Sequence, residues 1–329
     1  MKVHYDLAAL PRFKNAVVTI GTFDGVHLGH RQIITQLKEE AEKISGETVI
    51  ITFHPHPRKV ISSIPGDIRL LATPEEKIEL LEHAGIDHLV VVTFNYAFAN
   101  QTAEQYIKEF LYKHFNPHTV ILGYDHHFGK SREGDYHLMN QYGESLGFKV
   151  KEIPGQVMNE VAISSTRIRE SLLASDIETA NSLLGYHYFF EGLVIEGNKL
   201  GRTLGYPTAN LHIESDEKLI PGNGVYAVKV TLSNPVSRIP YLASNIVHPT
   251  SNILHYKGMM NIGVRPTVDG TKRMIEVNIF DFDADIYGEV IRVDVIHYLR
   301  GEVKFNGLEE LKGQLSKDKV AANEKLKGS

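Results

Sequence analysis

The sequence predicts two domains: an α/β domain with a parallel sheet, then an antiparallel β-barrel or sandwich that ends in a helix. The 329 residues are enough for two domains, each with its own core. Up to about residue 185, short apolar strands alternate with helices, which is typical of right-handed βαβ units. After that point strands follow one another without intervening helices, which is typical of antiparallel sheets.

The first half contains four β-branched or apolar runs that we expect to be buried strands, at residues 17–20, 48–53, 88–94 and 119–123. A helix is expected over 28–44 because its apolar residues keep helical spacing, and Gly46 can end it. Residues 73–76 form a Thr-Pro-Glu-Glu capping box, which predicts a helix that stops at Gly85. Residues 102–105 offer another cap.

The second half has strand-like segments at residues 188–197, 224–232, 273–280 and 290–299. A final helix is expected over 308–326, with Asn306 as its N-cap. The Ser-, Asn- and Pro-rich stretch 233–256 is expected to be a long loop. The change of pattern between residues 184 and 188 predicts domains at 1–185 and 186–329.

Composition excludes several classes of function. The net charge of −5 leaves no electrostatic footprint for nucleic-acid binding, and the absence of cysteine excludes disulfides, thiolate catalysis and cysteine-ligated zinc. No signal core or membrane-length apolar run is present, so we expect a cytoplasmic protein without a membrane partner.

The segment GTFDGVHLGH (21–30) lies between a predicted strand and a predicted helix. Converging backbone amides and the positive end of a helix dipole bind phosphate at such a junction. His27 and His30 can both face a bound polyphosphate and donate hydrogen bonds to oxygens that gain charge during transfer at phosphorus. The alternative is that one histidine caps the helix and the other is solvated.

A second phosphate candidate is ISSTRIRESLL (163–173). Its Ser and Thr hydroxyls can cap a helix, while Arg167 and Arg169 follow in the first turn. Arginine is unfavourable there unless an anion is present, although ordinary capping also explains the segment.

In the second half, GNKLGRTLGYPTANL (197–211) combines glycines with Thr208 and Asn210, two oxygen ligands at i and i+2. Such hard ligands suit Mg²⁺ bound to substrate phosphates, and the alternative is a Gly-Pro turn with capping polar residues. Glu276 lies in a predicted strand, so its fixed orientation makes it the better candidate for a general base than the clustered aspartates 281, 283 and 285.

GTFDGVHLGH and ISSTRIR resemble the HxGH nucleotidyltransferases, and more narrowly the FMN adenylyltransferase module of prokaryotic FAD synthetases. TFHPHPRKV (52–60) and GYDHHFGKSREGD (123–135) resemble two further stretches of that module. The resemblance implies a Rossmann-like domain in which His27 and His30 stabilise the transferring adenylyl phosphate. It further implies that the nucleotide is contacted by Gly21, Phe23, Asp24, Gly29, Ser165, Thr166 and Arg169. It implies flavin contacts at Asp125 and Phe128.

GRTLGYPTANL, PGNGVYAV, NIGVRPT, IFDFDADIYG and LRGEVKF resemble the riboflavin kinase module, so the whole chain resembles the bifunctional riboflavin kinase/FAD synthetases. This implies a Greek-key barrel in which Thr208 and Asn210 bind Mg²⁺–ATP and Glu276 accepts the proton of the ribityl hydroxyl. It also implies nucleotide contacts at Gly201, Arg202 and Gly205, and a flavin contact at Arg265. The sequence departs from the family at Val277-Asn278, where threonine-histidine is frequent.

The predicted function is FAD biosynthesis with riboflavin, FMN and ATP as substrates and Mg²⁺ as cofactor. The C-terminal module would phosphorylate riboflavin to FMN, and the N-terminal module would adenylylate FMN to FAD. One alternative is an FMN adenylyltransferase with a degenerate flavin-binding barrel. Others are a flavin-binding regulatory protein without catalysis, a nucleotidyltransferase for pantetheine or glycerol phosphate and, more weakly, an aminoacyl-tRNA synthetase.

Overall fold

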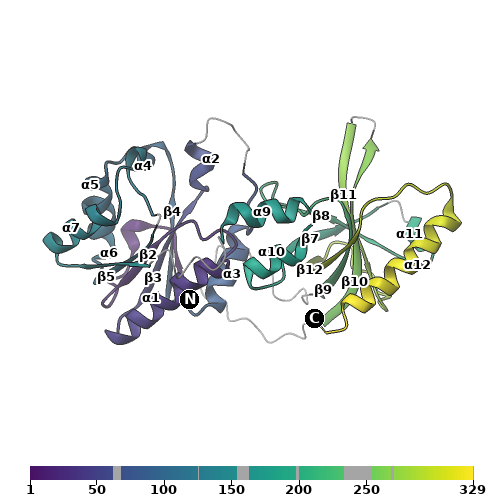
Figure 1. Cartoon of the computed structure of the whole chain (residues 1–329), viewed down its shortest axis with the longest axis horizontal. Helices are drawn as coiled ribbons and strands as arrows, with labels where there is room; N and C mark the ends of the chain where they lie inside the picture. Colours follow the sequence, from purple (N-terminus) through teal and green to yellow (C-terminus); the bar gives the residue numbers. More distant parts are fainter. Residues whose placement is uncertain are drawn as a thin grey trace. The chain divides into compact units, whose positions relative to one another are not determined.

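The structure is a computed structural model, and the part of the chain that it describes is residues 1–61, 68–124, 126–153, 163–197, 200–232, 254–267 and 270–328. The side chains of residues 200, 265–267 and 270–272 are outside this description. The chain divides into two compact units, Met1–Ser165 and Thr166–Ser329 (Figure 1). The sequence-based boundary at 185/186 falls inside the second unit, between the helix that ends at Leu184 and the strand that begins at Phe189.

The first unit is built on a six-stranded parallel sheet in the order β1-β4-β3-β2-β5-β6. Its strands are β1 (Lys2–His4), β2 (Val17–Ile20), β3 (Thr48–His54), β4 (His88–Thr93), β5 (Thr119–Gly123) and β6 (Lys149–Ile153). The four central strands are those predicted. The two edge strands were missed because one has three residues and the other, KVKEI, is largely polar and half exposed.

Helices cover both faces of this sheet (Figure 1). They are α1 (Leu28–Lys43), α2 (Pro57–Ile61), α3 (Pro74–His83), α4 (Tyr96–Ala99), α5 (Ala103–Gln105), the π-helix η2 (Tyr106–Tyr112), α6 (Lys113–Phe115) and α7 (Tyr136–Leu146), with 3-10 turns η1 (Leu7–Ala9) and η3 (Lys130–Arg132). The predicted capping boxes are confirmed: Thr73 caps α3 and Thr102 caps α5, each with its reciprocal partner.

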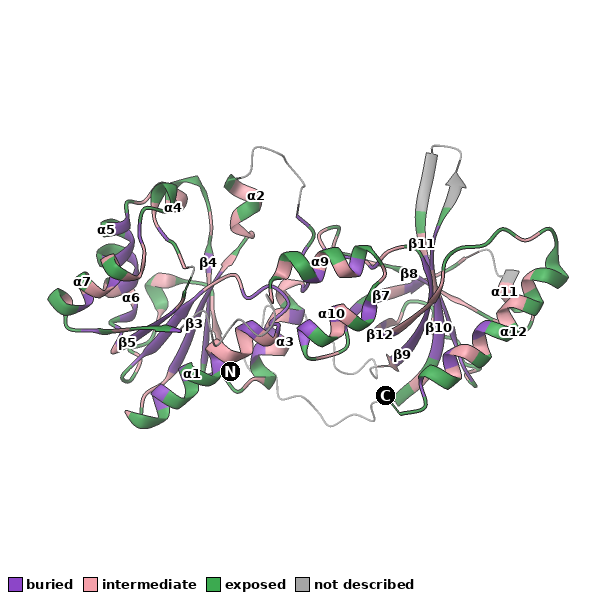
Figure 2. Ribbon diagram, viewed as in Figure 1, coloured by how far each residue is buried: buried purple, intermediate pink, exposed green. Residues whose placement is uncertain are grey.

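The core explains why the strands read as unbroken apolar runs. Val17 and Ile50 pack with α1 and α3 on one face, whereas Val18 and Ile51 pack with the α5–α6 segment and α7 on the other. Because both faces are covered, every residue of β2 is buried and no polar alternation is needed (Figure 2).

The second unit contains a closed six-stranded antiparallel barrel in the order β10-β11-β8-β7-β12-β9. Its strands are β7 (Phe189–Ile195), β8 (Ala209–His212), β9 (Gly224–Leu232), β10 (Leu254–Thr267), β11 (Gly270–Ile279) and β12 (Val290–Arg300). Because β12 returns to lie beside β9, the order β12-β9-β10-β11 is a Greek key. Strand β8 was missed because it is short and its first three residues lie inside the glycine-rich motif.

The helices of this unit are α9 (Ser165–Leu173), which begins at the unit boundary, α10 (Ile177–Leu184), α11 (Leu200–Thr203) and α12 (Leu308–Lys325). Ala322 and Leu326 at the end of α12 pack on Ala227, Met259 and Ile296 of the barrel.

Two sequence expectations change at the ends of the barrel's strands and helices. The N-cap of α12 is Gly307, so the prediction of Asn306 was wrong; instead the Glu310 carboxylate accepts from the Asn306 backbone N–H at 2.9 Å. Of the predicted loop 233–256, residues 233–253 lie outside the described residues, and the last three belong to β10.

Candidate functional site

The glycine-rich turn of the first unit lies at the point where the order of the sheet reverses. From β2 the chain adds β3 and then β4 on one side, before β5 and β6 are added on the other side. Ligand sites of open parallel sheets form at the carboxyl ends of the strands at this position. The turn follows β2 directly, and the segment that begins at Tyr124 follows β5, so both predicted stretches lie at this edge.

The turn has an unusual backbone. Phe23 and Val26 have positive φ values of 47° and 37°, which is strained for residues with a side chain, and Gly25 has 76°. The Asp24 carboxylate holds the turn from inside, since it accepts from the backbone N–H groups of Leu71 and Ala72 at 2.9 and 3.2 Å. Asp24 is buried, and its hydrogen bonds stabilise the conformation of the turn.

The two histidines stack at the start of α1. Their ring centroids are 3.7 Å apart and their planes differ by 17°. His27 is the N-cap, and its Nδ1 accepts from the His30 backbone N–H at 3.4 Å. In the neutral ring the proton of His27 is thus on Nε2, which can donate to a ligand.

His30 is only partly exposed and stacks on His27, in contrast to the solvated histidine of the alternative considered from the sequence. Its Nδ1 is buried and has no hydrogen-bond partner among the residues that the structure describes. Burial lowers the pKa of His30 well below its usual 6.5, and the neighbouring His27 and Lys77 lower it further. The imidazole is therefore neutral at pH 7, with a polar atom that a bound phosphate group would satisfy.

Some of the other predicted nucleotide contacts lie at the same turn, and others belong to the second unit. Gly21 lies against the Phe23 ring, Gly29 is buried in the first turn of α1, and Ser165 Oγ donates to the carbonyl of Asp24 at 3.2 Å. Thr166 and Arg169 follow Ser165 in α9 and belong to the second unit.

The predicted flavin contacts have different outcomes. Asp125 and the side chain of Arg265 lie outside what the structure describes. Phe128 is buried in the core, where its ring stacks on Tyr106 with centroids 5.0 Å apart.

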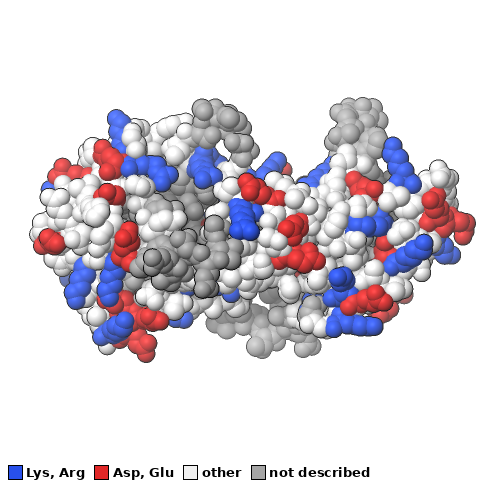
Figure 3. Space-filling view, in the orientation of Figure 1, with Lys and Arg blue, Asp and Glu red and all other residues white. Residues whose placement is uncertain are grey.

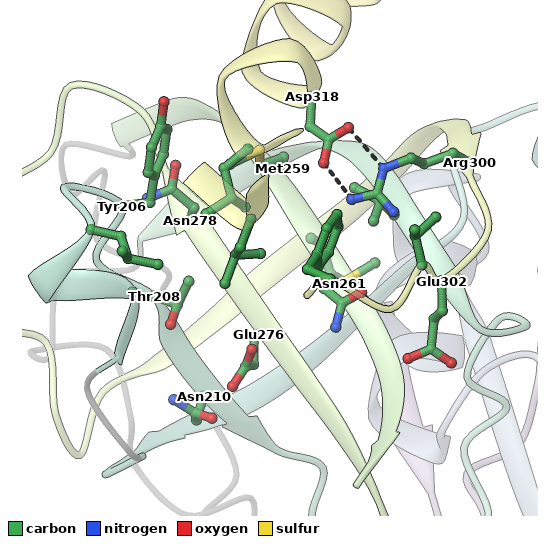
Figure 4. A pocket seen from close by; sticks show the side chains of 18 residues that line it. Tyr206, Thr208, Asn210, Met259, Asn261, Glu276, Asn278, Arg300, Glu302 and Asp318 are labelled. Atoms are coloured by element: carbon green, nitrogen blue, oxygen red, sulfur yellow. Dashed lines mark hydrogen bonds and ion pairs between the residues drawn. The ribbon is translucent and has the colours of Figure 1, made fainter. Parts of the chain in front are cut away.

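The second unit has a pocket between the barrel strands and α12. Figure 4 shows Thr208, Asn210 and Glu276 at one end and Arg300, Glu302 and Asp318 at the other. The structure thus brings the predicted metal ligands and the predicted general base to one pocket. Its complete lining is Gly201, Leu204, Tyr206, Thr208, Asn210, Val225, Met259, Met260, Asn261, Glu276, Asn278, Arg300, Glu302, Val303, Phe305, Leu311, Leu315 and Asp318.

Strand register explains this convergence. Glu276 of β11 lies directly opposite Asn210 of β8 on one side and Asn261 of β10 on the other. Directly opposed residues share a face of the sheet, so three polar side chains form one row across three strands. Asn261 was not predicted, because no strand was predicted over β10 and its place in the row depends on the register of the β10–β11 pair.

The environment of Asn210 fits a cation. Its Oδ1 is buried without a hydrogen-bond partner among the described residues, and oxygen is the ligand that Mg²⁺ prefers. A Cβ at Gly197 would lie 2.0 Å from Asn210 Nδ2, so glycine there leaves room for the amide. Thr208 and Asn210 are the residues that would hold the ion.

Asn278 gives a physical reason for the departure at Val277-Asn278. Val277 is fully buried in the barrel, while Asn278, two residues after Glu276, faces the pocket. The Asn278 amide donates to the carbonyl of Pro207 at 2.6 Å, directly before Thr208. Asn278 therefore orients the segment that carries Thr208.

The glycine motif is only partly in the pocket. A Cβ at Gly201 would lie 2.3 Å from the carbonyl oxygen of Tyr206, and Gly205 has a φ of 84°, so both positions favour glycine. Gly201 lines the pocket, whereas the exposed Arg202 and Gly205 are not among the described residues that line it.

Two surface properties complete the description. Lys and Arg side chains are interspersed with Asp and Glu over the face shown in Figure 3. In the described part of the chain, no helix combines the length and apolar character needed to cross a membrane.

Comparison with known proteins assigns both units. Residues 10–167 match the FAD synthetase family model, and residues 184–326 match the riboflavin kinase model. The bifunctional riboflavin kinase/FMN adenylyltransferase of Haemophilus influenzae is 35% identical over 93% of this chain and 92% of its own. That of Bacillus subtilis is 36% identical over 93% and 91%. The chain belongs to this family of bifunctional enzymes.

Family membership gives the chain its two activities, riboflavin kinase and FMN adenylyltransferase, which together produce FAD. A crystal structure of a Streptococcus pneumoniae protein described as a macrolide-efflux protein has the same fold. It matches with a TM-score of 0.85 and 29% identity over 98% of both chains.

Proposed function

We propose that the barrel pocket phosphorylates riboflavin and that the histidine turn adenylylates the resulting FMN. In the first reaction, the terminal ribityl oxygen attacks the γ-phosphorus of ATP, its proton leaves and ADP departs. In the second, an FMN phosphate oxygen attacks the α-phosphorus of ATP, and pyrophosphate departs.

In the kinase site, Glu276 accepts the proton of the ribityl hydroxyl. Glu276 lies on β11, which pairs with β8 on one side and β10 on the other. This position supports the role, because the two neighbouring strands restrict the movement of the Glu276 backbone. Thr208 and Asn210 would hold Mg²⁺, which when bound neutralises charge on the ATP phosphates. The nucleotide lies along the segment that contains Gly201, as expected for a tight approach to backbone.

In the adenylyltransferase site, the Nε2–H of His27 and the neutral ring of His30 donate hydrogen bonds to the α-phosphate, whose charge grows during transfer. Ser165, Thr166 and Arg169 stay predicted contacts of the remaining ATP phosphates. Asp125 and Phe128 stay predicted flavin contacts of this unit, and Arg265 stays a predicted flavin contact of the barrel. The cytoplasmic location also stays a prediction.

The observation that supports the proposal is that each unit has its own set of polar side chains. Asn210, Glu276 and Asn261 form a row in the barrel pocket, and the stacked pair His27 and His30 belongs to the other unit. Purified protein is incubated with riboflavin and Mg–ATP, and the products are separated by chromatography. FMN followed by FAD is expected. Formation of neither would refute the proposal, while FAD from FMN but no FMN from riboflavin would indicate the adenylyltransferase with a degenerate barrel.

A further inference from the structure

Lys77 of α3 reaches the turn that carries the two histidines. Its Nζ donates to the carbonyl of Thr22 at 2.8 Å and to Thr52 Oγ1 at 3.4 Å. Thr52 Oγ1 donates to the same Thr22 carbonyl at 3.0 Å. This carbonyl therefore has two side-chain donors, one from α3 and one from β3, directly before the strained residue Phe23.

The position of Lys77 is unfavourable for a cation on general grounds. It lies near the start of α3, where the helix dipole disfavours positive charge. Burial lowers its pKa, and the nearby Asp24 carboxylate raises it in part. An apolar side chain would fill the same volume without the cost of desolvating an ammonium group, so the charge indicates a role in the site.

We propose that Lys77 is a positioning residue for adenylyl transfer: its ammonium fixes the Thr22 carbonyl and, through it, the strained turn that presents His27 and His30. The inference rests on the proposed roles of these two histidines. Its physical basis is that a turn held in a strained form needs contacts that oppose relaxation. Asp24 supplies such contacts at one point of the turn and Lys77 supplies them at another.

The same ammonium acts electrostatically on His30. The groups that lower the pKa of His30 by their charge are His27 on α1 and Lys77 on α3, while Asp24 faces Lys77. A cation beside an imidazole disfavours a second positive charge. Burial is the largest cause of the lowered pKa of His30, and Lys77 adds to it while also keeping the turn in place.

The test compares Lys77→Met, Lys77→Arg and Thr52→Val with a matched control in the full-length protein. The control is Lys38→Met, because Lys38 Nζ also donates to a backbone carbonyl, that of Ala84, at 3.0 Å, away from the turn. FAD formation from FMN gives kcat and the KM for ATP, and NMR of labelled histidine gives the titration midpoint of His30. Riboflavin phosphorylation by the same chains reports that the other unit is intact.

Lys77→Met is expected to lower kcat/KM for adenylylation roughly tenfold to hundredfold, and to raise the midpoint of His30. Lys77→Arg should restore a midpoint near that of the parent, because the charge is kept. Thr52→Val should weaken ATP binding, because it removes a hydrogen bond to the Thr22 carbonyl of the turn. It should leave the titration midpoint of His30 unchanged, because it removes no charge. Lys38→Met should change neither quantity.

Parent values of both quantities in Lys77→Met would overturn the inference, as would equal effects in Lys38→Met. If Lys77→Met does not fold, the test passes to the other two variants: unchanged ATP binding in Thr52→Val, or a raised midpoint in Lys77→Arg, would then overturn it. His30→Ala is measured in parallel. Undiminished adenylylation in that variant would refute the proposed site itself, which separates the two failures.

Discussion

Arg300 and Asp318 form a two-point ion pair that joins the end of β12 to the middle of α12. Arg300 Nε lies 2.9 Å from Asp318 Oδ1, and Nη2 lies 2.6 Å from Oδ2 (Figure 4). The side chain of Asp318 is 4% exposed and that of Arg300 is 22% exposed. Because both residues line the barrel pocket that we propose as the kinase site, the pair holds α12 as one wall of it.

Asp318→Ala should destabilise the second unit by about 3 kcal/mol, because it leaves the guanidinium partly buried without its partner. The KM for riboflavin should rise as the wall loosens. Urea denaturation and kinase kinetics measure the two effects. The double variant Arg300→Met/Asp318→Leu should recover much of the stability, since no unpaired charge remains; a loss as large as in Asp318→Ala would contradict this explanation.

Glu276→Gln should lower kcat for riboflavin phosphorylation by about 10²- to 10⁴-fold, the usual contribution of a general base. Adenylylation of supplied FMN should be unchanged, because that reaction is assigned to the other unit. The matched control is Asp283→Asn, which neutralises an exposed carboxylate shortly after the same strand. Kinase activity that survives Glu276→Gln, or falls equally in Asp283→Asn, would remove the proton-acceptor role.

Local patterns predicted much of this molecule. The buried strand at 17–20 and the capping box at Thr73 are visible in short windows, because chain neighbours determine them. Thr208, Asn210 and Glu276, which the structure places in one pocket, could be proposed for the same reason, since each lies in a motif or a strand whose chemistry is visible locally.

The residues that were missed depend on how separate elements pair and pack against one another. Asn261 reaches Glu276 through strand register, and Asp318 meets Arg300 across 18 residues and a change from strand to helix. Lys77 reads as an ordinary residue of a capped helix until α3 is placed beside the turn. Such partners follow from tertiary packing, and a single sequence carries no local signal for them.

His30→Ala should strongly reduce FAD formation while FMN still accumulates from riboflavin and ATP. Loss of a hydrogen-bond donor to the reacting phosphate is expected to cost about 10²- to 10³-fold in kcat. Chromatography of the products distinguishes this outcome from a general loss of activity. If His30→Ala removed both activities while the protein stayed folded, the assignment of the two reactions to separate units would be wrong.

Asn210→Ala should raise the Mg²⁺ concentration needed for riboflavin phosphorylation by at least about tenfold, because an oxygen ligand is lost. The Mg²⁺ dependence of adenylylation should stay as in the parent. Binding of Mn²⁺, followed by the relaxation of water protons, gives a readout that is independent of turnover. Equal Mn²⁺ binding by parent and variant would argue against Asn210 as a ligand.

The pKa of His30 makes the stability of the first unit depend on pH in a definite direction. The folded pKa lies below the usual 6.5, mainly because of burial, so below pH 6.5 the unfolded state binds more protons than the folded state. The stability that His30 contributes is therefore fully present above pH 6.5. It is lost as the pH falls toward the folded pKa, by up to about 1.4 kcal/mol per pH unit.

His30→Gln removes the titrating group while a polar side chain remains, so the Tm of this variant should fall less than that of the parent between about pH 7.5 and pH 5. His4, whose pKa is also lowered by burial, is present in both proteins, so its contribution cancels in the difference between the two slopes. Parallel Tm profiles would show that His30 is protonated as readily in the folded protein as in the unfolded chain.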